Sequence, residues 1–293
     1  MSEFKVNTIT NKDGSYGPQV CGITTFGSSG LQLPSGPTDF RGGRGRAVFL
    51  RGYAPGVNNT MDYANIATLG DAIDFGDTDG NIVQFASAGS ATRGVISGGN
   101  SPAGESYYFT FSSGGGVNDF GNQTFNRRGA GGCNDSTRAV FGGGKGNVSP
   151  LNDFTNVIDF FIFSTIGDAI DFGDLTVARG SFGGGSNATR GLFASGFDSP
   201  TNYNVIDYIT IATQGNAIDF GDTLQSGIHN TGTACSQTRA LFAGGYLAPS
   251  PSSNIISYAT ISTTGDAADF GDLTVAGSVG NDGATSDVNG GIQ

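Results

Sequence analysis

The chain has 293 residues, of which 13% are charged, 51 are glycine and 22 are phenylalanine, and its formal net charge is −11. A hydrophobic content of 37% excludes a disordered chain, because it supplies enough apolar surface for a core. The acidic balance argues against nucleic acid and anionic lipid as partners, since phosphate groups require a basic face. The length suits one large all-β domain.

Targeting and cysteine signals are weak. No apolar run approaches 18 residues, and the N-terminus lacks the basic and apolar regions of a signal peptide, so we expect no membrane association. Cys21, Cys133 and Cys235 are too few and too scattered for a disulfide framework or a zinc site. We expect buried thiols in a protein made in a reducing cytoplasm.

Residues 1–43 contain no copy of the repeat described next. Short β-prone pieces at residues 4–9 and 20–26 alternate with turn signals such as Asn11–Gly14. This pattern predicts an extended N-terminal arm that packs against the following domain or against a partner.

A repeated unit fills the rest of the chain. Its opening arginine returns at steps of 47, 45, 52 and 49 residues, and Asp-Phe-Gly-Asp or Asp-Phe-Gly-Asn closes each copy. A period of this size is typical of repeat architectures whose units cannot bury their apolar face alone. The five arginines are Arg46, Arg93, Arg138, Arg190 and Arg239, and the closing motifs are residues 74–77, 119–122, 171–174, 219–222 and 269–272.

Each copy reads as a series of short strands. The first follows the arginine and ends in a glycine pair, as in 240–245, and close packing of innermost strands explains that pair. An alternating strand follows, clearest at 204–213. Glycine then predicts a two-residue hairpin before a third strand that carries the closing motif. The stretch Leu175–Phe182 crosses to the next copy; the hairpin glycines are Gly70, Gly167, Gly215 and Gly265.

Short strands with no helical period predict several four-stranded sheets in radial repetition. We therefore expect an all-β fold, a five-bladed β-propeller of repeats of about 48 residues over 44–293, preceded by the arm. Six blades, with the arm recruited as one, is the alternative. Residues 284–292 echo the opening strand of a unit and are expected to complete or cover the first blade.

The order of hydrophobic strand, glycine pair, tyrosine strand, glycine turn, aromatic residue and Leu-Thr-Val-Ala-Arg resembles the kelch repeat over about residues 44–280. Kelch repeats carry a tryptophan, and this chain has none. The phenylalanine of the closing motif stands in that place, so the resemblance implies a kelch-like blade without implying kinship to cellular kelch proteins.

A second resemblance covers nearly the whole chain. Lys5–Gly17, Cys21–Gly30 and the recurring Ile-Asp-Tyr and Ile-Asp-Phe-Gly-Asp-Leu-Thr units resemble virion structural proteins of tailed phages that infect marine cyanobacteria. Those proteins are described as tail-fibre-like or structural. The resemblance implies a bacteriophage virion protein, made in the host cytoplasm, whose arm docks to other virion proteins.

The recurring charged and aromatic residues have two interpretations. In the functional one, a ring of cations or carboxylates binds an anion or a metal at the axis. In the structural one, each arginine binds a carboxylate or carbonyl groups and ties one blade to another. Repetition in every blade favours the structural role. This set comprises the five arginines with Asp74, Phe75, Phe120, Asp171, Phe172, Asp219, Phe220, Asp269 and Phe270.

The loops after the glycine pairs differ between copies and are expected on one face of the disc. Loop residues on a rigid scaffold are the usual place for recognition, although plain solvated turns remain an alternative. The candidate ligand-binding residues, for a glycan of the host surface, are Asn59, Glu105, Asn147, Asp198, Tyr203 and Tyr246.

Catalysis is not expected. His229 is the only histidine, which excludes copper-oxidase chemistry of the kind found on kelch-like blades and leaves no second histidine to support a Ser-His-Asp set. We expect no cofactor and no metal. The leading hypothesis is a non-enzymatic virion component, tail- or fibre-associated and displayed for host attachment. A lectin-like adhesin and a structural spacer in neck or tail are the alternatives.

Overall fold

The computed structural model describes residues 46–50, 59–65, 69–80, 82–99, 104–146, 153–247 and 252–277. All of them belong to one compact unit, residues 40–293. In this part of the chain the regular structure is entirely β, and it contains no helix able to cross a membrane. The expected arm (1–43) and the expected closing strand (284–292) lie outside the described residues.

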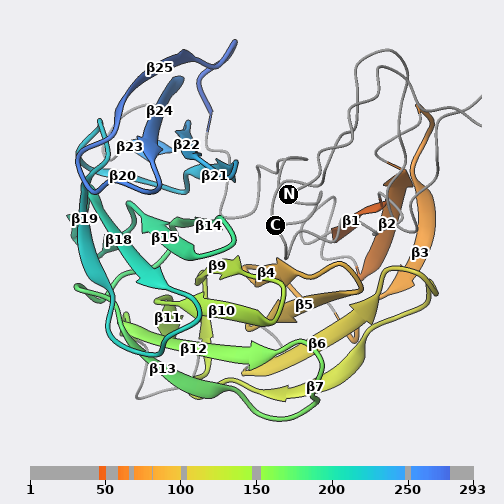
Figure 1. Cartoon of the computed structure of the whole chain (residues 1–293). Coiled ribbons are helices and arrows are strands. Elements are labelled where there is room, and N and C mark those ends of the chain that lie inside the picture. Colours follow the sequence, from red (N-terminus) through yellow and green to blue (C-terminus); the bar gives the residue numbers. More distant parts are fainter. Residues whose placement is uncertain are drawn as a thin grey trace, which may run out of the picture. The chain divides into compact units, whose positions relative to one another are not determined.

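Five antiparallel sheets follow one another in a ring, so the unit is a five-bladed β-propeller (Figure 1). The prediction of an all-β fold with five blades is confirmed, and the alternative of six is not. In chain order the blades contain β1 (Arg46–Leu50), β2 (Thr60–Asn65) and β3 (Ile73–Asp77); β4 (Ala86–Gly89), β5 (Arg93–Ser97), β6 (Glu105–Thr110) and β7 (Asn118–Asn122); β9 (Gly131–Asn134), β10 (Arg138–Gly142), β12 (Val157–Ile162) and β13 (Ile170–Asp174); β14 (Gly183–Ser186), β15 (Arg190–Ala194), β18 (Val205–Thr210) and β19 (Ile218–Asp222); and β21 (Gly232–Cys235), β22 (Arg239–Ala243), β24 (Ile255–Thr260) and β25 (Ala268–Asp272).

Three two-stranded ribbons accompany the later blades. In two of them, the segment after the second strand of a blade pairs with the crossing segment that enters the same blade, and in the third this segment folds back on itself. We call these the side ribbons. They are β8 (Arg127–Arg128) with β11 (Lys145–Gly146), β16 (Phe197–Asp198) with β17 (Thr201–Asn202), and β20 (Ile228–His229) with β23 (Tyr246–Leu247).

The arginine strand was predicted to be the innermost strand, and this is wrong. In the second to fifth blades it is the second strand, and a four-residue strand of small residues precedes it: β4, β9, β14 and β21. These four contact one another in succession along the inside of the ring (Figure 1). A Cβ atom on Gly184 would collide with the backbone of Gly132 in the neighbouring blade, so close approach is what demands small residues here.

The glycine pair therefore has another role. Its residues have positive φ, for example +63° at Gly143 and +108° at Gly144, and they turn the chain out of the second strand. A Cβ atom on Gly144 would also meet the carbonyl oxygen of Arg128 at 2.8 Å, in the incoming crossing. The pair thus combines a turn with a close approach between neighbouring segments.

The core is divided among the junctions between blades. Four clusters of buried side chains each join two consecutive blades, from first–second to fourth–fifth. In β18, Ile209 packs toward the third blade and Ile206 toward the fifth, so both faces of this strand are buried. Each blade is stable only between its neighbours, as expected for a repeat architecture.

The predicted two-residue hairpin is also wrong. Seven residues connect the third and fourth strands, for example 163–169 and 211–217. The extra length lets the loop reach the preceding blade, where the Gly167 amide donates to the Phe120 carbonyl (2.9 Å) and the Gly215 amide to the Phe172 carbonyl (2.8 Å). The glycine has positive φ as expected, but it serves a contact between blades.

Candidate functional site

The recurring arginines bind carbonyl groups of the next blade. Arg93 Nη1 donates to the Phe163 carbonyl at 2.6 Å and Arg190 Nη1 to the Ile261 carbonyl at 2.8 Å. Arg46 and Arg138 make the same bond to Phe111 (2.6 Å) and Ile211 (2.8 Å). The structure therefore places these side chains at the junctions between blades, on carbonyls and not on the closing motifs.

Each arginine also lies over an aromatic ring of its own blade, with its Cζ 4.6–4.9 Å from the ring centroid. That ring in turn meets the phenylalanine of the closing motif edge to face, as in Tyr208 with Phe220 at 5.9 Å. Phe75, Phe120, Phe172 and Phe220 are at most 4% exposed, whereas Phe270 of the fifth blade is 50% exposed. These residues form the stacked layer that joins the blades.

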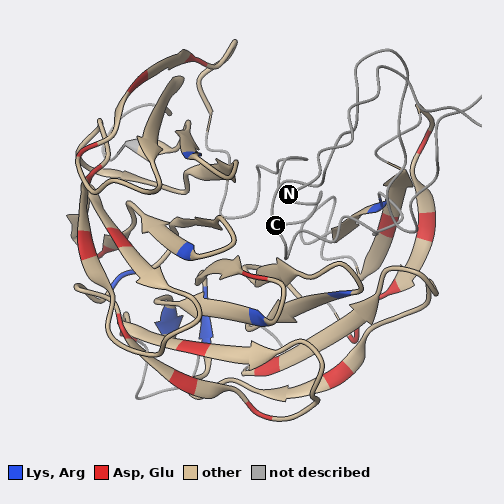
Figure 2. Cartoon of the chain, in the orientation of Figure 1, with Lys and Arg blue, Asp and Glu red and all other residues tan. Residues whose placement is uncertain are grey.

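The aspartates of the closing motifs lie on the outermost strands. Asp74, Asp119 and Asp219 each accept a hydrogen bond at 3.1 Å from the amide two residues on, which stabilises the local bulge. Asp171 and Asp269 occupy the same position and are exposed. Acidic residues accordingly follow the outer strands, while arginines lie further inside (Figure 2). Within the described residues, no three His, Cys, Asp or Glu side chains are placed to share a metal ion.

Two buried ion pairs, missed at the sequence level, fill the second–third and third–fourth junctions. Arg127 pairs with Asp159, and Arg179 pairs with Asp207 at 2.8 Å, all four side chains being fully buried. Arg179 also donates to the carbonyls of Phe193 (3.1 Å) and Ser195 (2.8 Å). A buried ion pair is compatible with stability only when its geometry is good and extra hydrogen bonds satisfy it.

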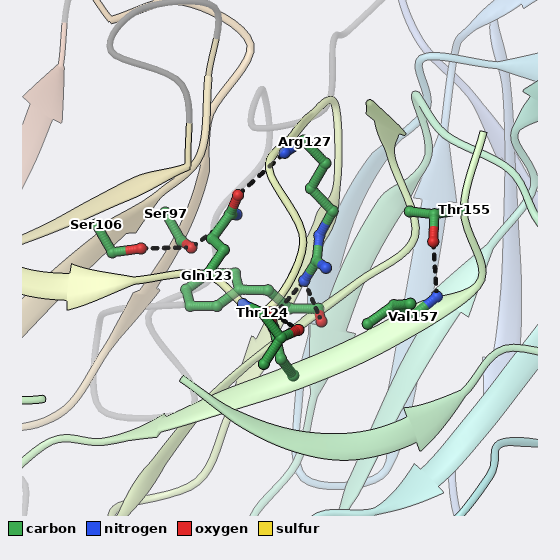
Figure 3. A network of polar contacts seen from close by, with 9 residues as sticks. Ser97, Ser106, Gln123, Thr124, Arg127, Thr155 and Val157 are labelled. Atoms are coloured by element: carbon green, nitrogen blue, oxygen red, sulfur yellow. Dashed lines mark hydrogen bonds and ion pairs between the residues drawn. The ribbon is translucent and has the colours of Figure 1, made fainter. Parts of the chain in front are cut away.

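Figure 3 shows the network around the first pair. Arg127 donates through Nη2 to Asp159 and to the Phe141 carbonyl, and its amide donates to Gln123 Oε1 at 3.1 Å. Gln123 Nε2 then donates to Ser97 Oγ at 3.0 Å, which links the pair to the second blade. Arg127 Nε and Nη1 have no partner among the described residues.

The other two junctions lack the pair. Ile82 and Ile228 stand where the buried arginines stand, and Tyr107 and Ser257 stand where the aspartates stand. At the fourth–fifth junction a small cavity occupies the space, and Ile228 and Ser257 both line it. The two positions therefore change together at the four described junctions: arginine occurs with aspartate, and isoleucine occurs with a neutral residue.

The side ribbons carry a row of four aromatic rings from three blades. Phe154 contacts Phe197 (centroids 4.9 Å apart), Phe197 contacts His229 (4.7 Å), and His229 contacts Tyr246 (5.2 Å). We call Phe154, Phe197, His229 and Tyr246 the aromatic row. Lys145 Nζ lies 5.4 Å from the Phe154 centroid at one end. Burial lowers the pKa of His229, which favours the neutral imidazole.

The predicted loop residues are only partly brought together. Tyr246 belongs to the aromatic row and is 40% exposed. Asp198 and Tyr203 lie half-buried at the β16–β17 side ribbon that carries Phe197. Asn59 and Glu105 lie in the first and second blades, where the Asn59 carbonyl accepts from Thr78 and Glu105 accepts from the Tyr107 hydroxyl. Asn147 lies outside the described residues.

The remaining members of the row were not predicted from the sequence. Phe154 and Phe197 were missed because neither position is aromatic in every copy. His229 served in the sequence analysis only to exclude catalytic chemistry that needs more than one histidine. The signal available was the position directly after the glycine pair, which is Lys145, Phe197 or Tyr246 in the last three blades. The two sequence cysteines within the described part, Cys133 and Cys235, are buried and free.

Comparison with protein-family models finds no match, and comparison with curated proteins finds no relative. The fold class is therefore established by the geometry of the five blades, and it is compatible with a structural or an adhesive role.

Proposed function

We propose that this protein is a non-enzymatic display scaffold of a bacteriophage virion, tail- or fibre-associated, whose propeller presents its side ribbons for attachment to a host surface. The supporting observation is that recurring residues and variable residues lie in different parts of the propeller. The recurring arginines, aromatics and glycines are used in contacts between blades, whereas the residues that differ between copies gather on the side ribbons. A rigid framework with variable projecting segments is the usual construction of a recognition surface.

The virion setting rests on the sequence resemblance to structural proteins of tailed cyanobacterial phages. In this proposal residues 1–43 anchor the chain to other virion proteins, and the propeller has neither cofactor nor metal. The exposed acidic outer strands agree with a partner that is neither nucleic acid nor an anionic membrane, because like charges repel (Figure 2).

Two measurements test the proposal. Antibody against the purified full chain should label intact particles at the tail, and excess purified chain should slow adsorption of those particles to host cells. Labelling without any effect on adsorption would favour the spacer role in neck or tail. Absence of the chain from particles would refute the virion role altogether.

The anchor has its own test. Deletion of residues 1–40 is expected to abolish incorporation into particles while leaving the propeller folded, as judged by an unchanged circular dichroism spectrum. Normal incorporation of a folded deletion variant would show that attachment lies elsewhere.

A further inference from the structure

The aromatic row is not accounted for by the fold. None of its four residues belongs to the four buried clusters that join the blades. All are partly exposed, and Tyr246 is the most open at 40%. Their contacts join the ribbons of neighbouring blades, and the partly exposed surfaces of the rings remain available to a ligand.

Equivalent positions confirm that the fold does not require aromatic residues there. Thr155, Tyr203 and Ser253 are equivalent because each amide bonds the carbonyl of the second glycine of its own blade, at 2.8–2.9 Å. The residue preceding each of them is Phe154, Asn202 or Ser252. A second bond relates the crossing segments, because the amide of the second glycine of a blade donates to the carbonyl of Arg127, Arg179 or Ile228 in the segment that follows that blade. The next residue is Arg128, Gly180 or His229, so only the last copy has an aromatic ring at this position. Aromatic character at these places is therefore specific to the row.

We propose that the aromatic row is a binding surface for a neutral saccharide chain. This inference rests on the proposed attachment function and names its ligand class. A sugar ring has apolar C–H faces and hydroxyl groups at its rim, so it suits partly exposed aromatic rings bordered by polar groups. Here the Lys145 ammonium lies at one end of the row and the Tyr246 hydroxyl at the other.

The shape of the row favours a chain over a compact ligand. Each ring contacts only its neighbours, in the order Phe154, Phe197, His229, Tyr246, and consecutive planes are inclined by 64°, 39° and 63°. A box for a methylated ammonium ion needs several ring faces around one point, and a linear row does not provide it.

Charge further restricts the class of saccharide that we expect to bind. Lys145 and Arg128, which pair across β11 and β8, lie at the Phe154 end of the row, and the whole chain has a net charge of −11. At a distance the net charge repels an acidic glycan, whereas a neutral one meets no electrostatic barrier, and the acidic glycans of the test measure whether the two local cations outweigh that repulsion.

The test uses the full-length chain and a panel of neutral glucose, galactose and mannose oligosaccharides, with sialylated and sulfated glycans alongside, measured by glycan array and titration calorimetry. We expect binding of at least one neutral chain. Tyr246→Ala and Phe197→Ala should each weaken it by about tenfold or more, as for aromatic anchors at other interfaces. Phe270→Ala is the matched control, because Phe270 is an exposed aromatic residue of β25 outside the row, and should change binding less than about twofold.

Circular dichroism and melting temperature verify that every variant is folded. Binding of acidic glycans alone, no binding of any neutral chain, or full binding by both row variants would each overturn the inference. Adsorption experiments separate it from the proposed function. If wild-type chain and both row variants slow adsorption equally, attachment stands and the row is not its site; if neutral sugars bind but no chain affects adsorption, the site stands and the attachment function fails.

Discussion

At the scale of single residues, the recurring arginine shows how one side chain serves two neighbours. Arg190 stacks over Tyr208 in its own blade and donates to the Ile261 carbonyl in the next. A guanidinium group suits this position because its planar face packs on a ring while its edge donates hydrogen bonds. Lysine has no such planar group, so it is a poor substitute there.

The buried cysteines give a prediction at this scale. Burial raises the pKa of Cys235 to about 12, and burial likewise raises the pKa of Cys133 well above its ordinary value. Because the thiolate is the reactive form, a raised pKa keeps both groups protonated and inert at pH 8. We expect a Cys21→Ser variant to show no fast reaction with a disulfide reagent while native, and two reactive thiols in guanidinium chloride. Fast reaction of the native variant would contradict this.

At the scale of elements, the junction between two blades is the unit that carries stability. Its buried core and its arginine–carbonyl bond join different blades, and in two cases a buried ion pair fixes the crossing segment to the blade that it enters. A strand can therefore be understood only together with the strands on both sides of it.

The ion pairs predict a specific pattern of coupling. Asp207→Ser should destabilise the protein by about 3–5 kcal/mol, because it leaves Arg179 charged, buried and unpaired. The double variant Arg179→Ile with Asp207→Ser should recover most of that loss, since it reproduces the combination of Ile228 with Ser257 at the next junction. Urea unfolding of the two single variants and the double variant completes the thermodynamic cycle. Additive losses would show that the residues act independently.

The loop contacts predict a difference between two glycines of similar conformation. Gly215 and Gly221 have φ of +151° and +141°. A Cβ atom on Gly221 would approach the Gly265 backbone to 2.5 Å, whereas one on Gly215 would meet no atom within 4 Å. Gly221→Ala should therefore lower the free energy of unfolding by clearly more than Gly215→Ala, which measures backbone strain alone. Equal losses in urea unfolding would mean that the contact contributes nothing.

Sequence reasoning succeeded where the chain repeats a large residue and failed where it repeats small ones. The recurring phenylalanine fixed the number of blades, since each ring must be covered by the next blade. The innermost strands were missed because stretches such as Gly183–Ser186 have low β-propensity, and packing between blades makes them strands. Arg127 and Arg179 were recognisable only through Asp159 and Asp207, which follow them in the same copies, and this signal is incomplete because the first copy has the equivalent aspartate, Asp62.

The sequence predicted which loops are variable, but not which of their side chains meet. The variable segments after the glycine pairs do carry exposed residues such as Tyr246, but spacing alone does not show that Phe154 and His229 complete a row with it. The contacts of the row join residues separated by 43 positions (Phe154 and Phe197), 32 positions (Phe197 and His229) and 17 positions (His229 and Tyr246). The first two depend on the angle between neighbouring blades, which no local pattern encodes.

At the scale of the whole molecule, stability is a sum over neighbouring blades, as in other repeat proteins. Inter-blade bonds in the described part join each blade to the next, from the first to the fifth. The effect of a mutation should accordingly decline with distance along the series.

Hydrogen exchange tests this expectation. In Asp207→Ser, amide protection should fall most in β10–β13 and β15–β19, the blades on either side of the altered junction, and should stay near the wild-type level in β4–β6. Gly265→Ala serves as the control, because the Gly265 amide donates to the Phe220 carbonyl at the fourth–fifth junction. A uniform loss over all blades would show that the five blades open together.

The position of the ion pairs has a consequence for how such a molecule diversifies. Arg127 and Asp159 lie on one continuous stretch of chain, as do Arg179 and Asp207, because each pair joins a crossing segment to the blade that it enters. A genetic exchange with crossover points just before these arginines and just after these aspartates transfers the matched partners together, along with the intervening ribbon. Recombination at those points would deliver a new recognition segment without leaving an orphaned charge in the interior.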